Sequence, residues 1–182
     1  LKTLIRAVAW HGYSGAPDKM RTIRQMFPEV EMHWTEGFVG YEASEYLNGW
    51  CDSANTFIDI LNNGAQSITV WNVALDERGK PNIGPFRCGG LVTIHSQTGE
   101  VVRSGMYWAL AHFSRAIRRG ALHLSTSGRL AQVKHLAFRN VDGSRALIVC
   151  NRGPARKISV SEGRKQLELQ LEPDSITSAV WS

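Results

Sequence analysis

The stretch VEMHWTE at residues 30–36 has the composition of a β-strand and ends on a carboxylate. Similar strand-like runs lie on either side of it, IRAVAWHGY at residues 5–13 and QSITVWN at residues 66–72. Between these runs, residues 18–27 and 50–61 place apolar side chains at helical spacing. Strands separated by helices predict βαβ units and a parallel sheet.

The second half of the chain has a different pattern. Residues 104–117 predict an amphipathic helix, and beyond Gly120 only strand signals follow, separated by turns such as Asp142-Gly143. The strand-like runs cover residues 133–138, 145–150, 157–160, 167–171 and 175–181. This succession predicts an antiparallel β-sandwich. We therefore expect an α/β portion at residues 1–118 and a β-sandwich domain at residues 119–182.

Length and composition limit the fold and the partners. The chain has 182 residues, too few for a complete (β/α)₈ barrel of about 250 residues. Its net charge is +5, but Lys and Arg are scattered along the sequence, which argues against a nucleic-acid partner. No apolar run reaches the roughly 18 residues of a membrane span, so we expect no stable membrane insertion. The three cysteines lack metal-ligand spacing and are predicted to be buried thiols.

Chemistry-bearing residues cluster where the predicted parallel strands end. His11 and Tyr13 end the first strand, Glu36 ends the second, and Trp71 and Asn72 end the third. Functional groups of βα units lie at the carboxyl ends of the strands. These residues are therefore the candidate site.

The second strand carries its carboxylate in an unusual place. Strict alternation along the strand puts Val30, Met32, Trp34 and Glu36 on one face, so that a carboxylate ends a row of apolar side chains. Such a position costs desolvation energy unless the carboxylate is hydrogen-bonded or functional.

A strand-end carboxylate beside a phenol and an indole suits glycoside hydrolysis. The carboxylate attacks the anomeric carbon, the phenol positions it, and the indole stacks on the sugar. Structural roles remain open at each position. Glu36 could cap a helix or meet an arginine, Tyr13 and Trp71 could be core aromatics, and His11 could be a hydrogen-bonded structural residue.

Several ordered blocks resemble glycoside hydrolase family 30, the glucosylceramidase-like enzymes. The blocks are AWHGYSG at 9–15, HWTEG at 33–37, VWNVALD with GKPN at 70–82, GLVTI at 90–94 and YWALAHFSR at 107–115. The resemblance implies a (β/α)₈ TIM barrel with an attached antiparallel β-sandwich. It assigns the three parallel strands to strands 6–8 of the barrel, so that the chain is the C-terminal portion of such an enzyme.

The resemblance also implies residue roles. Glu36 falls on the catalytic nucleophile, His11 and Tyr13 line the site with Tyr13 bonded to the nucleophile, and Trp71 and Asn72 lie beside the sugar ring. The family's general acid/base is a second Glu after the fourth barrel strand, which has no match here. We therefore expect an N-terminal part of the barrel in a longer parent protein, and no activity for the chain alone.

The implied function is that of a retaining β-glycosidase, glucosidase-like or glucosylceramidase-like, which needs no metal or organic cofactor. A carbohydrate or a glycolipid is the expected substrate. Fucosidase, xylosidase and β-1,6-glucanase activities remain open, as does a role in sphingolipid metabolism. The substrate class implies a secreted, periplasmic or lysosomal-like location. The alternative function is a non-catalytic carbohydrate-binding module, since half of the catalytic pair is not in this chain.

Overall fold

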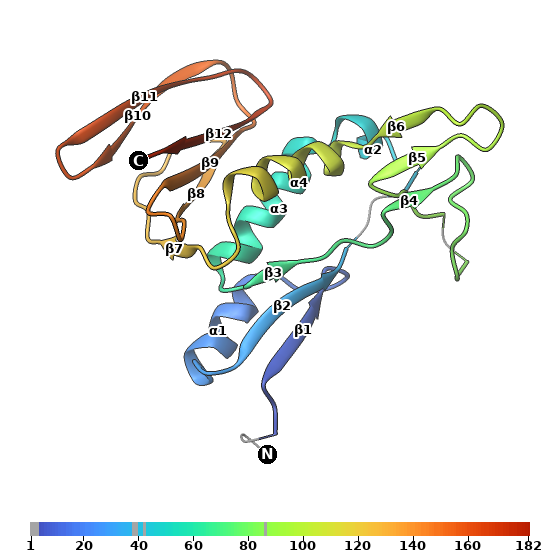
Figure 1. The fold of residues 1–182 in the computed structure, drawn as a ribbon, viewed down its shortest axis with the longest axis horizontal. Coiled ribbons are helices and arrows are strands. Elements are labelled where there is room, and N and C mark those ends of the chain that lie inside the picture. Colours follow the sequence, from blue (N-terminus) through green and yellow to red (C-terminus); the bar gives the residue numbers. More distant parts are fainter. Residues whose placement is uncertain (1–3, 38–39, 42, 86) are drawn as a thin grey trace. The chain divides into compact units, whose positions relative to one another are not determined.

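The chain folds into two compact units, shown as a ribbon in Figure 1. The computed structural model describes residues 4–37, 40–41, 43–85 and 87–182. The first unit comprises Leu1–Gly49 and Thr56–Tyr107, and the second comprises Trp50–Asn55 and Trp108–Ser182.

The first unit contains the predicted parallel sheet. Its strands β1 (Ala7–His11), β2 (Glu31–Glu36) and β3 (Ser67–Ile68) lie in the order β1-β2-β3 and are all parallel. The connecting helices are α1 (Asp18–Met26), α2 (Glu45–Asn48) and α3 (Trp50–Asn62). A second sheet contains β4 (Ala74–Leu75), β5 (Val92–Ile94) and β6 (Val101–Arg103). The short elements α2, β4 and β6 were not predicted.

An apolar core forms between helices and one face of the parallel sheet. Met20 of α1, Met32 and Trp34 of β2, and Ile60 of α3 are buried in a single cluster. Ala9, on the other face of β1, is exposed. One covered face and helical crossovers are the arrangement expected for adjacent strands of a (β/α)₈ barrel.

The register of β2 corrects the expected position of Glu36. Trp10 pairs with Trp34, but the next residue of β1, His11, pairs with Glu36, so that Thr35 is an extra residue in β2. Such a bulge shifts the following side chain to the opposite face of the sheet. The expectation that Glu36 continues the row of Val30, Met32 and Trp34 is therefore wrong. Glu36 lies on the side of its register partner His11, away from the apolar core.

The third predicted strand is shorter than expected. Regular pairing covers only Ser67 and Ile68, although Thr69 still donates a backbone hydrogen bond to the Trp34 carbonyl. The backbone of Asn72 then takes a left-handed conformation, with φ of 57°. The predicted strand over 66–72 is thus paired only near its start, and the left-handed backbone of Asn72 prevents it from continuing beyond its predicted end.

The second unit is the predicted antiparallel β-sandwich, preceded by α4 (Gly105–Ala116). One sheet has the order β12-β9-β8-β7, and β10 and β11 form the other. The strands are β7 (Leu122–Leu124), β8 (Val133–Arg139), β9 (Arg145–Asn151), β10 (Arg156–Glu162), β11 (Lys165–Leu171) and β12 (Ser175–Trp181). Ala137, Leu147, Val149 and Leu171 form its buried core.

A buried asparagine closes one end of the sandwich. The Asn151 side-chain nitrogen donates to the carbonyls of Gly153, Pro154 and Glu172 at 3.3, 3.0 and 2.9 Å. Its side-chain oxygen accepts from the Gly153 amide at 3.1 Å. Asn151 is fully buried. These bonds tie the β9–β10 and β11–β12 connections to the end of β9.

No helix in the described part of the chain combines the length and the hydropathy needed to cross a bilayer.

We predict that Asn151→Ala lowers the free energy of unfolding by about 2–3 kcal/mol, because it removes four hydrogen bonds made by a fully buried side chain. Denaturant titration followed by circular dichroism measures the change. The control is Asn48→Ala, the same substitution at an exposed residue, which should change stability by less than about 0.5 kcal/mol. Equal effects of the two substitutions would contradict this role of Asn151.

Candidate functional site

The Glu36 carboxylate is held by two side chains from the end of β1. The Tyr13 hydroxyl donates a hydrogen bond of 2.8 Å to Oε1. Nδ1 of His11 lies 3.0 Å from Oε2. The His11 and Tyr13 rings meet edge to face, with centroids 5.8 Å apart and planes at 84°. The side chain of Glu36 is 21% exposed, so the carboxylate is oriented and still open to solvent.

A close approach between the two strand ends makes this arrangement possible. The Gly12 amide donates to the Glu36 carbonyl at 3.3 Å. A β-carbon on Gly12 would overlap the buried indole of Trp34. Glycine at this position therefore lets β1 lie against Trp34 while His11 and Tyr13, on either side of it, reach Glu36.

The Tyr13 phenol beside Glu36 stays protonated. Partial burial, followed by the hydrogen bond to Glu36 and the charge of its carboxylate, raises the pKa of Tyr13 from 10.0 to about 12. Tyr13 is therefore a hydrogen-bond donor at every physiological pH. A permanent donor fixes the orientation of the carboxylate, which a nucleophile requires.

Trp71 and Asn72 are joined to the same strand end through the backbone. The Trp71 amide donates to the carbonyl of Gly37, the residue after Glu36, at 2.9 Å. The Asn72 carbonyl accepts from the Leu91 amide at 3.1 Å. Together with the left-handed φ of Asn72, these hydrogen bonds fix the backbone positions from which the two side chains extend.

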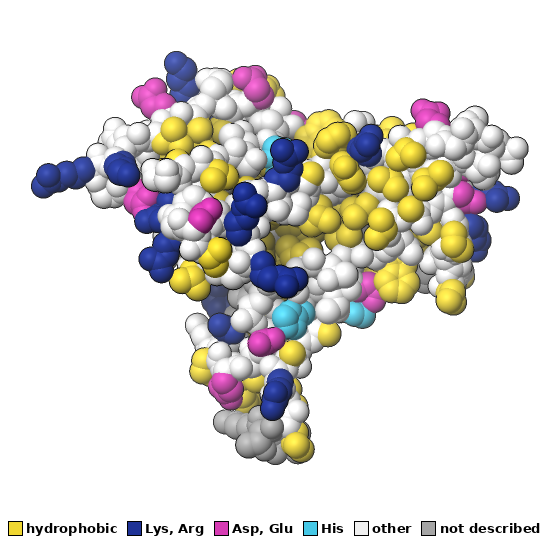
Figure 2. All heavy atoms as spheres, in the orientation of Figure 1, with side chains coloured by type: hydrophobic (Ala, Val, Ile, Leu, Met, Phe, Trp, Pro, Cys, Tyr) yellow, Lys and Arg dark blue, Asp and Glu magenta, His cyan; other side chains and the backbone are white. Residues whose placement is uncertain are grey.

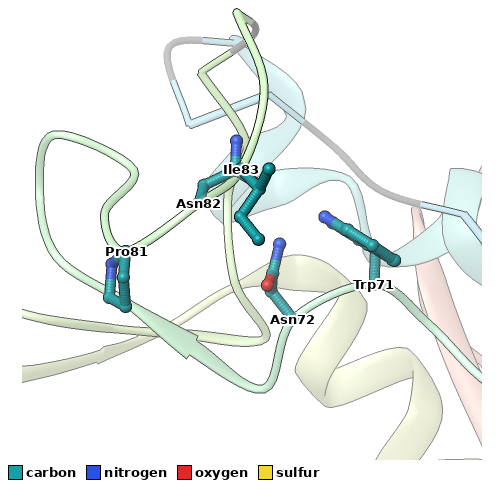
Figure 3. A pocket seen from close by; sticks show the side chains of 5 residues that line it. All are labelled: Trp71, Asn72, Pro81, Asn82 and Ile83. Carbon is teal, nitrogen blue, oxygen red and sulfur yellow. The ribbon is translucent and has the colours of Figure 1, made fainter.

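Both side chains line a pocket of about 630 Å³ with Pro81, Asn82 and Ile83. Figure 3 shows the Asn72 amide directed towards the side chain of Ile83, between Trp71 and Asn82. The amide nitrogen of Asn72 is buried and has no hydrogen-bond partner among the described residues. A buried donor without a partner is costly, and a hydroxyl-rich ligand can supply the acceptor.

An Asp-centred turn carries the opposite wall of this pocket. Oδ1 of Asp76 accepts from the amides of Arg78 and Lys80 at 2.9 and 2.7 Å. These hydrogen bonds, the one from Lys80 first, lower the pKa of Asp76. The turn places Pro81 and Ile83 at the edge of the pocket, and Ile83 is fully exposed.

Sequence reasoning overlooked Asn82, Ile83 and Cys88. Asn82 lines the pocket and donates from Nδ2 to the sulfur of buried Cys88 at 3.6 Å. Burial raises the pKa of Cys88, the hydrogen bond from Asn82 lowers it, and the charge of Glu36 adds to the rise. The GKPN block at residues 79–82 was the available signal, but it indicated only a turn.

All five predicted residues thus lie in the first unit at two joined places, the Glu36 cluster (His11, Tyr13, Glu36) and the Trp71 pocket (Trp71, Asn72, Pro81, Asn82, Ile83).

No group of three His, Cys, Asp or Glu side chains able to hold a metal occurs within the described ranges. On the face drawn in Figure 2, Lys and Arg side chains occupy several separate places among neutral and acidic ones.

Comparison with protein families gives two adjoining matches. Residues 3–117 match the TIM-barrel domain of glycosyl hydrolase family 30, and residues 120–179 match the β-sandwich domain of that family. The first match alone covers more than half of the chain.

Individual relatives agree with these matches. An endo-1,6-beta-D-glucanase from Neurospora crassa is 24% identical over 98% of the chain, and the lysosomal acid glucosylceramidase of Mus musculus is 25% identical over 80% of it. A solved endo-beta1,6-glucanase structure is 29% identical, superposes with a TM-score of 0.89 and covers 96% of the chain. The chain spans only 36%, 30% and 40% of these three proteins, respectively.

One family accounts for the fold, for the two domain matches and for the similarity to these enzymes. The chain belongs to glycoside hydrolase family 30, of which it holds the C-terminal part of the TIM barrel and the β-sandwich domain.

Proposed function

We propose that this chain supplies the nucleophile and the sugar-binding wall of a retaining β-glycosidase. The observation that carries the proposal is the Glu36 carboxylate, which is oriented by Tyr13 and His11 and is still partly open to solvent. Each carboxylate oxygen accepts one of these two contacts and retains a further lone pair. The carboxylate is thus held in place, and each of its oxygens keeps a lone pair available for reaction.

In the first step, a Glu36 oxygen attacks the anomeric carbon as the bond to the leaving oxygen breaks. This gives a covalent glycosyl-enzyme. Tyr13 and His11 keep the carboxylate in a fixed direction during the attack. Trp71 offers an apolar face to the sugar ring, and the unpartnered Asn72 amide donates to a sugar hydroxyl.

The second carboxyl group comes from outside this chain in the proposed mechanism. Within the described residues, the Glu36 carboxylate contacts a phenol and an imidazole, and no second carboxyl group contacts it. A retaining enzyme needs an acid/base about 5 Å from the nucleophile, first to protonate the leaving oxygen and then to activate water. We place that group on the remaining strands of a complete barrel in a longer protein.

The proposed substrate is a β-glucoside. Two relatives have names that specify glucosyl substrates, a β-1,6-glucan for one and a glucosylceramide for the other. This supports glucose at the site and leaves a glucan and a glycolipid as the two candidate substrates. The name of the second relative also supports the expected lysosomal-like location.

A carbohydrate-binding role without hydrolysis is the second candidate. It is favoured by the Trp71 pocket, whose stacking face and amide donor need no acid/base. The two functions differ in whether Glu36 is needed for turnover or for binding only.

We predict that Glu36→Gln, made in the full-length protein, lowers kcat by about 10⁴- to 10⁶-fold with little loss of stability. The amide keeps the size of the side chain and removes the charge that forms the glycosyl-enzyme. Release of 4-nitrophenol from an aryl β-glucoside measures kcat, and thermal melting measures stability.

Glu29→Gln is the matched control, because it makes the same change at an exposed residue before β2. It should leave kcat unchanged. Wild-type turnover in Glu36→Gln would rule out Glu36 as nucleophile. An unmodified protein that binds β-glucan without cleaving any glucoside would favour the binding role.

We also predict that Tyr13 ionises near pH 12 in this chain and at lower pH in Glu36→Gln. Only part of the shift should disappear, because burial is its largest cause. Since the pKa in the folded chain exceeds the ordinary value of 10.0, the stability that Tyr13 contributes is complete below pH 10 and is lost as the pH rises to about 12. The phenolate absorbance of the wild type minus that of Tyr13→Phe isolates this titration. Ionisation near pH 10 in both proteins would contradict the predicted coupling.

A further inference from the structure

Two buried cysteines outside the Glu36 cluster come together in the second unit. Cys51 is the second residue of α3, in the segment Trp50–Asn55 that belongs to this unit. Cys150 is the sixth residue of β9. Their exposed fractions are 1% and 0%, and both are thiols in this structure. The proposed glycosidase function uses neither of them.

Each sulfur reaches the backbone beside the other cysteine. The Cys150 thiol donates to the Cys51 carbonyl at 3.6 Å, and the Cys51 thiol donates to the Asn151 carbonyl at 4.0 Å. Each sulfur thus lies within 4.0 Å of the backbone at or next to the other cysteine, and both residues are shielded from solvent. Two sulfurs that each reach the backbone beside the other cysteine are close enough for a disulfide to form with little movement.

Neighbouring contacts hold the two segments in this register. Arg152 forms an ion pair with Asp52, and its Nε lies 3.5 Å from Oδ1 of Asp174. The indole nitrogen of Trp50 donates to the Asp174 carbonyl at 2.7 Å. Residues adjoining both cysteines are thus tied together, so bringing the sulfurs together costs little further conformational entropy.

The electrostatics of the pair make the two thiols unequal. The close interaction of the two sulfurs raises the pKa of Cys51 and lowers the pKa of Cys150, and Arg152 lowers the pKa of Cys150 further. Cys150 is therefore the sulfur that loses its proton first. The thiolate is the form that attacks a disulfide.

We infer that Cys51 and Cys150 form an intramolecular disulfide when the chain folds in an oxidising compartment. The oxidant is a small disulfide such as oxidised glutathione. The Cys150 thiolate attacks one of its sulfurs and releases one glutathione thiolate, which takes the proton of Cys51. The Cys51 thiolate then attacks the Cys150 sulfur, the protein S–S bond forms, and the second glutathione leaves. Two protein thiols are oxidised, and one glutathione disulfide is reduced to two thiols.

The cross-link joins residues 99 positions apart in the sequence. It restricts the unfolded chain more than the folded one, so the oxidised protein is the more stable form. In a reducing compartment the same two thiols remain packed as they are here. The redox state of the surroundings therefore sets the stability of the second unit.

The test uses the 182-residue chain itself and needs no enzymatic activity, so its outcome is separate from that of the proposed function. The chain is refolded in a mixture of reduced and oxidised glutathione, free thiols are blocked, and tryptic peptides are mapped without reduction. Cleavage places Cys51 in 25–78, Cys150 in 146–152 and Cys88 in 88–103. We expect 25–78 linked to 146–152, with Cys88 blocked as a free thiol.

Thermal melting provides the second measurement. The oxidised chain should melt about 5–10 °C above the same chain kept in a thiol reductant. Cys88→Ser should keep both the linked peptides and the shift, whereas Cys51→Ser and Cys150→Ser should each abolish both. Three blocked thiols after refolding, a link that includes Cys88, or a link between two chains would overturn the inference.

Discussion

The arrangement of the site depends on one extra residue in one strand. Thr35 has no register partner in β1, and this bulge moves Glu36 from the apolar face, where Trp34 packs, to the side of His11. Without it, the carboxylate would be directed at buried methionine and tryptophan side chains, which is prohibitive for a charge. With it, the carboxylate meets a phenol and an imidazole and remains partly hydrated.

The rest of the first unit supports that placement through the backbone. Gly12 lets the end of β1 approach Trp34, and the Trp71 amide is bound to the carbonyl of Gly37 directly after the bulge. Three strand ends are therefore linked to one another before any ligand arrives. The unpartnered amide of Asn72 is the polar group of the Trp71 pocket left without a protein acceptor in the described structure, and a sugar hydroxyl would satisfy it.

Much of the fold could be predicted from periodicity, because the long elements have strong patterns. The parallel order of the first three strands, the helix near residues 105–116 and the antiparallel sandwich are all present. The alternation of side chains along the strand predicted the wrong face for Glu36, because a bulge cannot be recognised in a pattern of seven residues. It also failed over residues 69–72, which apolar neighbours favoured as strand but which lie beyond the end of β3. Asn82 and Cys88 meet through a loop, which local sequence does not reveal.

Trapping the glycosyl-enzyme tests the central claim most directly. A 2-deoxy-2-fluoro-β-glucoside with a dinitrophenyl leaving group needs no acid to react, and its fluorine slows release of the sugar from the nucleophile. Treatment of the full-length protein followed by peptide fragmentation identifies the labelled side chain. We expect one sugar on Glu36, with inactivation proportional to labelling. Inactivation with the sugar on any other residue would contradict the assignment of Glu36 as nucleophile.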